Sequence, residues 1–538
     1  MEHSLLHALQ LVGLTVAGGS LWWRWIGPAI AHGSDGEGRR ATAGFWGRWA
    51  AWLAATATFL DLFVQVAELE GRTVFGGVPL QLVLDFSTGT NVGQLAVARV
   101  FTLVLLGFAF FLSTAAGALI QLGLYLLAAA LQASVTHAAA QPTGTALAVG
   151  IHFVHLVALS AWIGTVLQLW LQRPFLMEAF AGDNAAAWAG ALRRFSPVAL
   201  TAAAFVFVSG TIAAVRFVPS IYDLLFSAYG LTLILKLVLV AVILAAGAFN
   251  FLVAVPKMEE AARTHSHGAW RTASRDFLRA LEIEATAGVL AIAVAGIVAS
   301  VSPPGTEGAV SLTREQVAAL ITPKLPSASF VDPTLFVGDV ERNRFDLLYS
   351  EFMHNWSGVG VIVMGLFWLV QATATRAAGW ATRLWPYVFV PFAVFISAFA
   401  DPEVFVLRQV GFWEAVSDPV VLEHQIGALL VLWLVWLGRR DSCRPTEQRP
   451  LGPTLPLLMI GGSLLLLGHA HASVRATQEL TNLINVQHAV LGILGLLAGT
   501  IRWFLLRGLL PTRYFRFAWG ALIVLLGAFM AFFYREVV

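Results

Sequence analysis

Histidine is the residue type through which this chain could do metal chemistry. The sequence holds 13 His against one Cys and seven Met, so thiolate and thioether ligands are scarce. The lone cysteine, Cys443, excludes an intramolecular disulfide and a CxxC motif. Imidazole without thiolate suits Cu(II), Zn or Ni, with copper highest in the affinity order, and haem iron also accepts two imidazoles. The chemistry to expect is therefore binding of a metal ion or haem by histidine.

Three pairs of histidines have spacings that suit chelation. In two pairs the residues are three or four positions apart, so that both rings share one face of a helix. The third pair is an HxH motif, which can bind one ion at a fraying helix end. The pairs are His3 with His7, His152 with His155, and His469 with His471. A single histidine at a membrane interface is usually just a hydrogen-bonded residue, so the pairing is what favours ligands.

The candidate metal ligands fall into two groups along the chain. The first group is His3, His7, His152 and His155. The second group is His354, His424, His469, His471 and His488. Glu351 and Glu423 stand close to His354 and His424 in sequence, where they would either orient an imidazole N–H or supply interfacial charge.

Three other charged residues fall within or near apolar stretches. Asp61 is the one acid that we place deep inside an apolar run, where a carboxylate is a candidate for relaying protons or binding a cation. Arg99 and Lys236 should either extend outward to water or find a partner. A fixed cation there would repel a metal ion but attract a carboxylate or a haem propionate.

Membrane-spanning helices must position these residues. The chain of 538 residues is 58% hydrophobic and 12% charged, about half the charge of a soluble protein. Apolar runs recur that are long enough to cross a bilayer, and the first lacks the basic start and cleavage site of a signal peptide. We expect an all-α polytopic membrane protein with about fourteen spans. The expected spans are 5–26, 46–67, 96–113, 115–136, 147–171, 196–217, 230–254, 280–302, 352–372, 384–400, 420–438, 453–470, 482–505 and 515–534.

Lysine and arginine are concentrated in alternate connections, which the positive-inside rule places in the cytoplasm. Both termini then lie outside. In this topology every histidine except His32, His265 and His267 falls at the outer side of the bilayer. No series of His, Cys or Met runs from there to the cytoplasm, so the sequence supports metal binding at the outer face better than passage.

An internal repeat is expected in the first eight spans. Gly93 stands six residues before Arg99, and Gly230 stands six residues before Lys236, each at the outer start of a span. This pattern predicts two parallel four-helix repeats. In the polar stretch that follows, Thr313 with Gln316 is a capping-box pattern that predicts a short helix.

Several function classes are excluded by composition and motifs. The net charge of +2 and the scattered basic residues argue against nucleic-acid binding. We find no hydrolase nucleophile, phosphate-binding glycine loop or ATPase signature, and therefore do not expect an enzyme.

Four stretches in the middle of the chain resemble the copper-resistance protein D (CopD) family. They are IHFVHLVALSAWIG at 151–164, RRFSPVAL at 193–200, AYGLTLILKLVLV at 228–240 and LEIEATAGVLAIAVAGIVASVSPPG at 281–305. The likeness covers residues 140–305 well and the first 140 residues more loosely. The part from Ser350 onward resembles the C-terminal membrane extension of long family members. The resemblance implies a bacterial inner-membrane protein that transports or delivers copper together with a periplasmic CopC-like carrier.

We therefore expect an eight-helix CopD-like bundle followed by a six-helix bundle, with copper bound by histidines at the periplasmic face. The expected divisions are 1–137 and 138–305 for the two repeats, 306–350 for a periplasmic loop and 351–538 for the second bundle. Two alternatives stay open. One is a redox protein that binds haem b through the same histidines, and the other is an accessory subunit of an oxidase or exporter that binds no metal.

Overall fold

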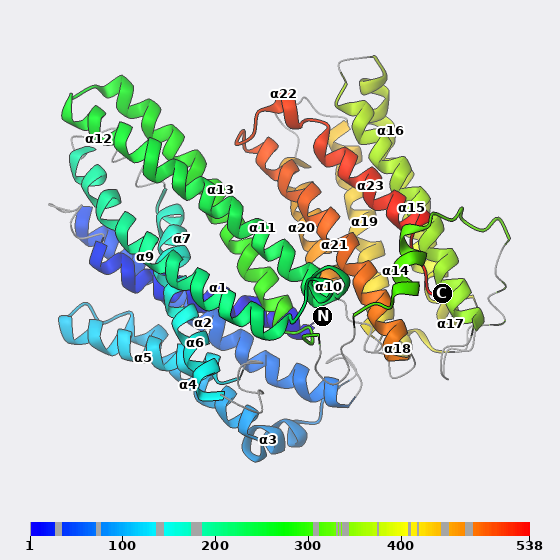
Figure 1. Ribbon diagram of the computed structural model, residues 1–538, viewed down its shortest axis with the longest axis horizontal. Coiled ribbons are helices and arrows are strands. Elements are labelled where there is room, and N and C mark those ends of the chain that lie inside the picture. Colours follow the sequence, from blue (N-terminus) through cyan, green and yellow to red (C-terminus); the bar gives the residue numbers. More distant parts are fainter. Residues whose placement is uncertain are drawn as a thin grey trace.

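A computed structural model gives the arrangement of the helices (Figure 1). The structure describes residues 2–26, 35–70, 77–135, 145–173, 185–304, 311–329, 332, 335, 344–373, 376–406, 410–416, 419–442, 451–468 and 477–537. These residues contain helices and connections and no strand. Figure 1 shows two helical bundles side by side, one coloured blue to green and the other lime to red.

The first bundle contains the helices up to Val298. Its elements are α1 (Glu2–Ile26), α2 (Asp35–Leu69), α3 (Leu80–Gly89), α4 (Asn91–Ala109), α5 (Ala115–Ala133), α6 (Thr145–Leu159), the π-helical turn η3 (Ser160–Gly164), α7 (Thr165–Leu171), α9 (Ala185–Phe217), α10 (Ile221–Phe226), α11 (Ala228–Phe249), the π-helical turn η4 (Asn250–Ala254), α12 (Val255–Arg263) and α13 (His267–Val298). The turns η3 and η4 interrupt otherwise continuous helices.

The second bundle follows a connection that holds α14 (Arg314–Ile321). Its elements are α15 (Arg344–Gln371), α16 (Arg376–Phe399), α17 (Pro402–Phe405), α18 (Phe412–Ala415), α19 (Pro419–Ser442), α20 (Leu451–Gly468), α21 (Gln478–Leu506), α22 (Thr512–Phe515) and α23 (Ala518–Phe532). The predicted capping box at α14 is confirmed, because Thr313 and Gln316 each bond the other's backbone N–H.

Twelve helical stretches among the described residues are long and apolar enough to cross a membrane. The prediction of an all-α polytopic membrane protein is therefore confirmed. The expected spans at 420–438 and 453–470 correspond to α19 and α20, which are not among these twelve. The number of fourteen and the outward termini remain predictions.

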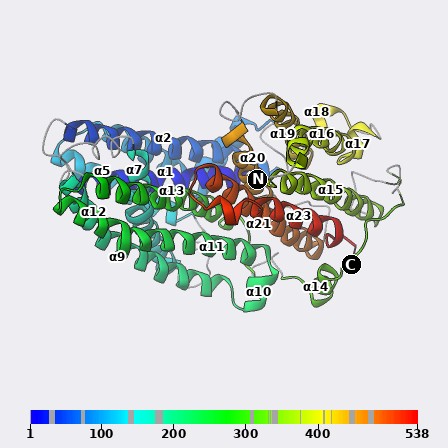
Figure 2. The same ribbon diagram turned by 90° about the horizontal axis from the view of Figure 1, so that it is seen from above.

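Helix α1 runs through the middle of the first bundle and contacts α2, α5, α7 and α13 (Figure 2). It also crosses η3 closely at Gly19 and Gly164. A Cβ placed on Gly19 would lie 2.1 Å from the carbonyl carbon of Gly164, so the crossing requires glycine. This contact fixes η3, and with it Trp162, against the centre of the bundle.

The two cation-bearing helices of the expected repeat have the same local structure. Each follows a short helix, and each is capped by a hydroxyl that accepts from the N–H of the predicted glycine: Thr90 for Gly93 and Ser227 for Gly230. A Cβ on either glycine would collide with backbone of the preceding short helix, at 2.2 Å from Phe86 O and 2.4 Å from Leu224 O. The two helices thus share their local structure, and the two-repeat organisation remains a prediction.

The two bundles touch along α20 and α21, which pack against α1, α11 and α13. Ile460, Leu467, Ala489 and Leu496 join the hydrophobic core of the first bundle. At the basic ends of these helices Arg507 Nε lies 2.5 Å from Glu282 Oε1. The second bundle is thus in direct contact with the first over much of the length of α21.

Candidate functional site

Asp61 is buried between α1 and α2 and accepts three side-chain hydrogen bonds. His3 Nδ1 lies 2.7 Å from its Oδ1, and Gln65 and Gln10 donate to its Oδ2 at 2.9 and 3.3 Å. The residue is 2% exposed. These contacts provide for a carboxylate inside an apolar span. The role that the sequence analysis gave Asp61, relaying protons or binding a cation, remains a prediction.

Arg99 continues this network toward α5. Its guanidinium donates to Gln10 Oε1 at 2.9 Å and to Gln132 Oε1 at 2.7 Å, and Gln132 Nε2 lies 3.4 Å from His7 Nε2. The side chain is buried, so Arg99 finds partners and does not extend to water. Because the His3 and His7 rings also meet edge to face, 5.8 Å apart, the network closes into a ring of polar side chains.

A cavity of about 200 Å³ lies beside this ring, and we call it the histidine cavity. His7, His152 and His155 all line it, together with Lys236 and Arg216. The rest of its wall is mainly apolar side chains of α6, α9, α11 and α13. Three of the four predicted ligands of the first group therefore face one space, while His3 is paired with Asp61.

The hydrogen bonds of Ser209 fix the tautomer of His155. The Ser209 hydroxyl donates its one proton to the carbonyl of Phe205, so its oxygen accepts from His155 Nδ1 at 2.9 Å. The ring of His155 therefore carries its lone pair on Nε2. His152 lies parallel to it with 6.3 Å between ring centroids.

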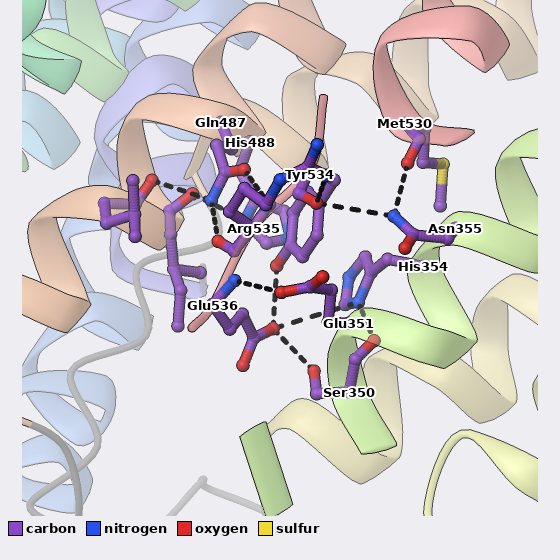
Figure 3. A network of polar contacts seen from close by, with 12 residues as sticks. Ser350, Glu351, His354, Asn355, Gln487, His488, Met530, Tyr534, Arg535 and Glu536 are labelled. Carbon is purple, nitrogen blue, oxygen red and sulfur yellow. Dashed lines mark hydrogen bonds and ion pairs between the residues drawn. The ribbon is translucent and has the colours of Figure 1, made fainter. Parts of the chain in front are cut away.

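The second bundle has a histidine pair of its own (Figure 3). The rings of His354 on α15 and His488 on α21 meet edge to face with centroids 5.8 Å apart. Tyr534 stacks on His354 at 4.1 Å. His354 Nδ1 donates to Ser350 O and His488 Nδ1 donates to Ile484 O, both at 2.8 Å, so each ring keeps its lone pair on Nε2.

The segment after α23 folds back over this pair (Figure 3). Gln487 pairs with the backbone N–H and carbonyl of Arg535, both at 2.7 Å, in the manner of a strand partner. Glu536 accepts from Ser350 Oγ at 2.6 Å and from Tyr534 OH at 3.0 Å. Residues 534–536 are therefore buried and held in place by polar contacts.

The sequence analysis expected two acids, Glu351 and Glu423, beside the second group of histidines, and the structure describes the side chain of Glu351. Glu351 accepts from Lys324 Nζ at 2.9 Å and from the backbone N–H of Glu536 at 3.1 Å, so it ties the connecting segment and the tail to α15. For His424 the structure gives an acid partner that the sequence analysis did not name, since its Nδ1 lies 2.9 Å from Asp401 Oδ1. The side chain of Glu423 lies outside the described residues, as do His469 and His471.

Five of the predicted ligands share one orientation. His3, His155, His354, His424 and His488 all direct Nδ1 at a protein group. Such contacts set the tautomer and leave Nε2 as the basic nitrogen, as in protein histidines that bind metals. Within the described part of the chain, however, no three His, Cys, Asp or Glu side chains are close enough to hold one metal ion together.

A buried acid near the middle of an apolar span was missed by the sequence analysis. Glu284 on α13 is 5% exposed and lines another cavity, of about 220 Å³, with Asn250, Ser196 and Trp162. We call this the Glu284 cavity. The expectation that Asp61 is the one buried acid was therefore wrong. The rule that singled out Asp61, a carboxylate inside an apolar span, applies equally to Glu284.

Residues 189–298 match the family model of copper resistance protein D. The chain carries a CopD domain. The match relates the protein to copper resistance, and no curated protein and no solved structure matches the chain.

The CopD domain contributes the polar residues of α9, α11 and α13 to both cavities. Ser209 and Lys236 face the histidine cavity, and Asn250 and Glu284 face the Glu284 cavity. His7, His152 and His155 come from helices before the matched residues. The histidine cavity thus lies between the CopD domain and the helices that precede it.

Proposed function

We propose that this chain is a copper-binding protein of the bacterial inner membrane that transports or delivers copper in copper resistance. The observation that carries the proposal is the convergence of His7, His152 and His155 on one cavity next to a CopD domain. Neutral imidazole is a good ligand for copper, and the His155 lone pair is available on Nε2. Copper would bind His152 and His155 first, after a rotation of their rings toward each other.

The charge at the cavity constrains the form in which copper arrives. Lys236 and Arg216 line the same wall and disfavour a bare cation. A copper ion that keeps an anionic ligand, such as a carboxylate, would satisfy both the imidazoles and these cations. We therefore propose that copper is handed over by a periplasmic CopC-like carrier with part of its ligand shell.

The second bundle supplies further copper ligands in this proposal. His354 and His488 would form one pair beneath the tail, and His424, His469 and His471 would add ligands at the same face. The two repeats, 1–137 and 138–305, would form the first site and 351–538 the second, joined by the periplasmic loop 306–350. The edge-to-face contact of His354 and His488 supports a two-imidazole site.

Copper content of the purified full-length chain tests the proposal. Wild-type protein is loaded with one, two or three equivalents of copper, desalted and measured by plasma mass spectrometry. We expect His152→Ala with His155→Ala to lose about one copper per chain. The matched control is His265→Ala with His267→Ala, because these two histidines are exposed at the opposite end of the bundle and should not matter. Equal copper in both double variants would refute the first site.

The absorption spectrum of the same preparation tests the haem alternative. A Soret band that persists through purification and disappears with His354→Ala or His488→Ala would show that these histidines bind haem b and not copper. We expect no such band.

A further inference from the structure

The histidine cavity and the Glu284 cavity lie one behind the other along the same helices. On α11 and η4, Lys236 lines the first and Asn250 lines the second, about 21 Å further along the helix axis. On α13, Ala295 lines the histidine cavity and Glu284 lines the Glu284 cavity. Both cavities therefore lie along one line that follows these helices through the first bundle.

Trp162 separates the two cavities. It is the only described residue that lines both, and it is 5% exposed. It sits in η3, whose π-helical turn is pressed against α1 at the Gly19–Gly164 crossing. Its indole also reaches the carboxylate of Glu284. Removing the indole would join the two spaces.

One buried oxygen in the Glu284 cavity lacks a hydrogen-bond donor among the described residues. Asn250 Nδ2 donates to Glu284 Oε2 at 3.4 Å, which leaves Asn250 Oδ1 buried without a hydrogen-bond partner among the described residues. Asn250 is 7% exposed and begins η4, a second π-helical turn, a feature often found at functional sites. A buried acceptor of this kind costs free energy unless something fills its lone pairs.

The charge of the Glu284 cavity also favours a bound cation. Glu284 is the one charged residue that lines it among the described residues. The other charged residues on the elements around it do not line it. They are Lys236 on α11, Lys257, Glu259, Glu260 and Arg263 on α12, Arg193, Arg194 and Arg216 on α9, and Arg271, Arg275, Asp276, Arg279 and Glu282 on α13. Gly247 leaves room for the carboxylate, because a Cβ there would lie 3.1 Å from Glu284 Oε1.

We propose that Glu284 and Asn250, in the cavity that Trp162 closes, form a binding site for one small monovalent cation, either a proton or a sodium ion. Carboxylate and carboxamide oxygens suit a hard cation, and one negative charge suits one positive charge. The site supplies the oxygen ligands and leaves copper to the imidazoles of the other cavity. Its role as the coupling ion of copper movement rests on the proposed function, but the site itself does not.

Binding of ²²Na⁺ and infrared spectroscopy on the full-length chain in detergent separate the two ions. A sodium site gives saturable ²²Na⁺ binding of about one per chain. A proton site gives no such binding but a carboxyl C=O band that appears as the pH is lowered. In either case we expect the signal to be lost in Glu284→Gln. For sodium, Asn250→Leu should weaken binding about 10-fold or more, as expected when a charged ligand loses one polar contact. For a proton, the carboxyl band should instead appear at a higher pH in Asn250→Leu, because the variant removes a hydrogen bond to the ionised carboxylate.

The matched control is Glu282→Gln, which removes an acid two positions away on the same helix that pairs with Arg507 outside the cavity. It should leave both signals unchanged. If wild type, Glu284→Gln and Asn250→Leu give the same sodium binding and the same carboxyl band, the site does not exist. Copper content, measured on the same samples, should be unchanged in all three variants, so that loss of the cation site and loss of the copper site are told apart.

Discussion

The indole of Trp162 reaches the carboxylate of Glu284 at the point where the histidine cavity ends and the Glu284 cavity begins. A smaller side chain at this position would connect the two spaces. The position also links the imidazoles at one end of the first bundle to the acid near its middle. Trp162 therefore lies where a passage through this bundle would open or close.

Replacing Trp162 by Ala should make the first bundle leaky. We expect copper entry into liposomes loaded with a copper-sensitive dye to rise about 10-fold or more, which corresponds to a barrier lower by about 1.4 kcal/mol. Trp162→Phe keeps an aromatic ring in place and should stay close to wild type. Liposomes with Trp162→Ala that are as tight as wild type would show that the cavities do not lie on a path.

The carboxylate of Asp61 should contribute strongly to stability. Asp61→Ala leaves the donors of His3, Gln10 and Gln65 without their acceptor in a buried setting. We expect a loss of about 3–5 kcal/mol, the usual cost of removing one partner of a buried charged network. Thermal unfolding in detergent measures it. Asp85→Asn, at an exposed acid on α3, is the control and should change the midpoint little.

The crossing of α1 and η3 should not tolerate a methyl group. Gly19→Ala places a Cβ 2.1 Å from backbone of Gly164, and neither helix can shift without moving the core. We expect destabilisation of about 1–3 kcal/mol or more from overpacking. Gly123→Ala on α5, where a Cβ would meet nothing within 4 Å, should be neutral or slightly stabilising. A Gly19→Ala protein as stable as Gly123→Ala would contradict the packing described.

Acidification should release the connection between the bundles. Hydrogen bonds from Ser220 and Ser311 lower the pKa of Asp223 on α10, and Tyr222 OH binds Leu312 O at 2.7 Å beside it. Since the folded pKa lies below the unfolded value of about 3.9, this contribution is present above that pH and disappears as the pH falls through the folded pKa.

Hydrogen exchange of residues 311–321, corrected for intrinsic rates, should therefore rise below about pH 4. Asp223→Asn should show the faster exchange already at pH 7. If the variant and wild type exchange alike at both pH values, Asp223 does not hold the connection.

The sequence predicted the helical fold and much of the candidate site because both depend on local patterns. Apolar runs gave the spans, and the matching positions of Gly93 and Gly230 agree with two capped helices of the same local structure. Other features depend on how helices pack. The partner of His424 is Asp401, 23 residues away, and the neighbour in sequence gave no hint of it. Glu284 itself could have been found by the rule that singled out Asp61, but its cavity could not, because it exists only where α7, α9, α11, η4 and α13 meet.

X-ray absorption at the copper edge of the loaded full-length chain tests the central claim most directly. Copper held by His152 and His155 predicts a first shell of nitrogen or oxygen with the outer-shell scattering of imidazole rings. That imidazole signature should weaken in His152→Ala with His155→Ala and persist in His265→Ala with His267→Ala. A spectrum dominated by sulfur, or one that is identical in both double variants, would contradict copper binding in the histidine cavity.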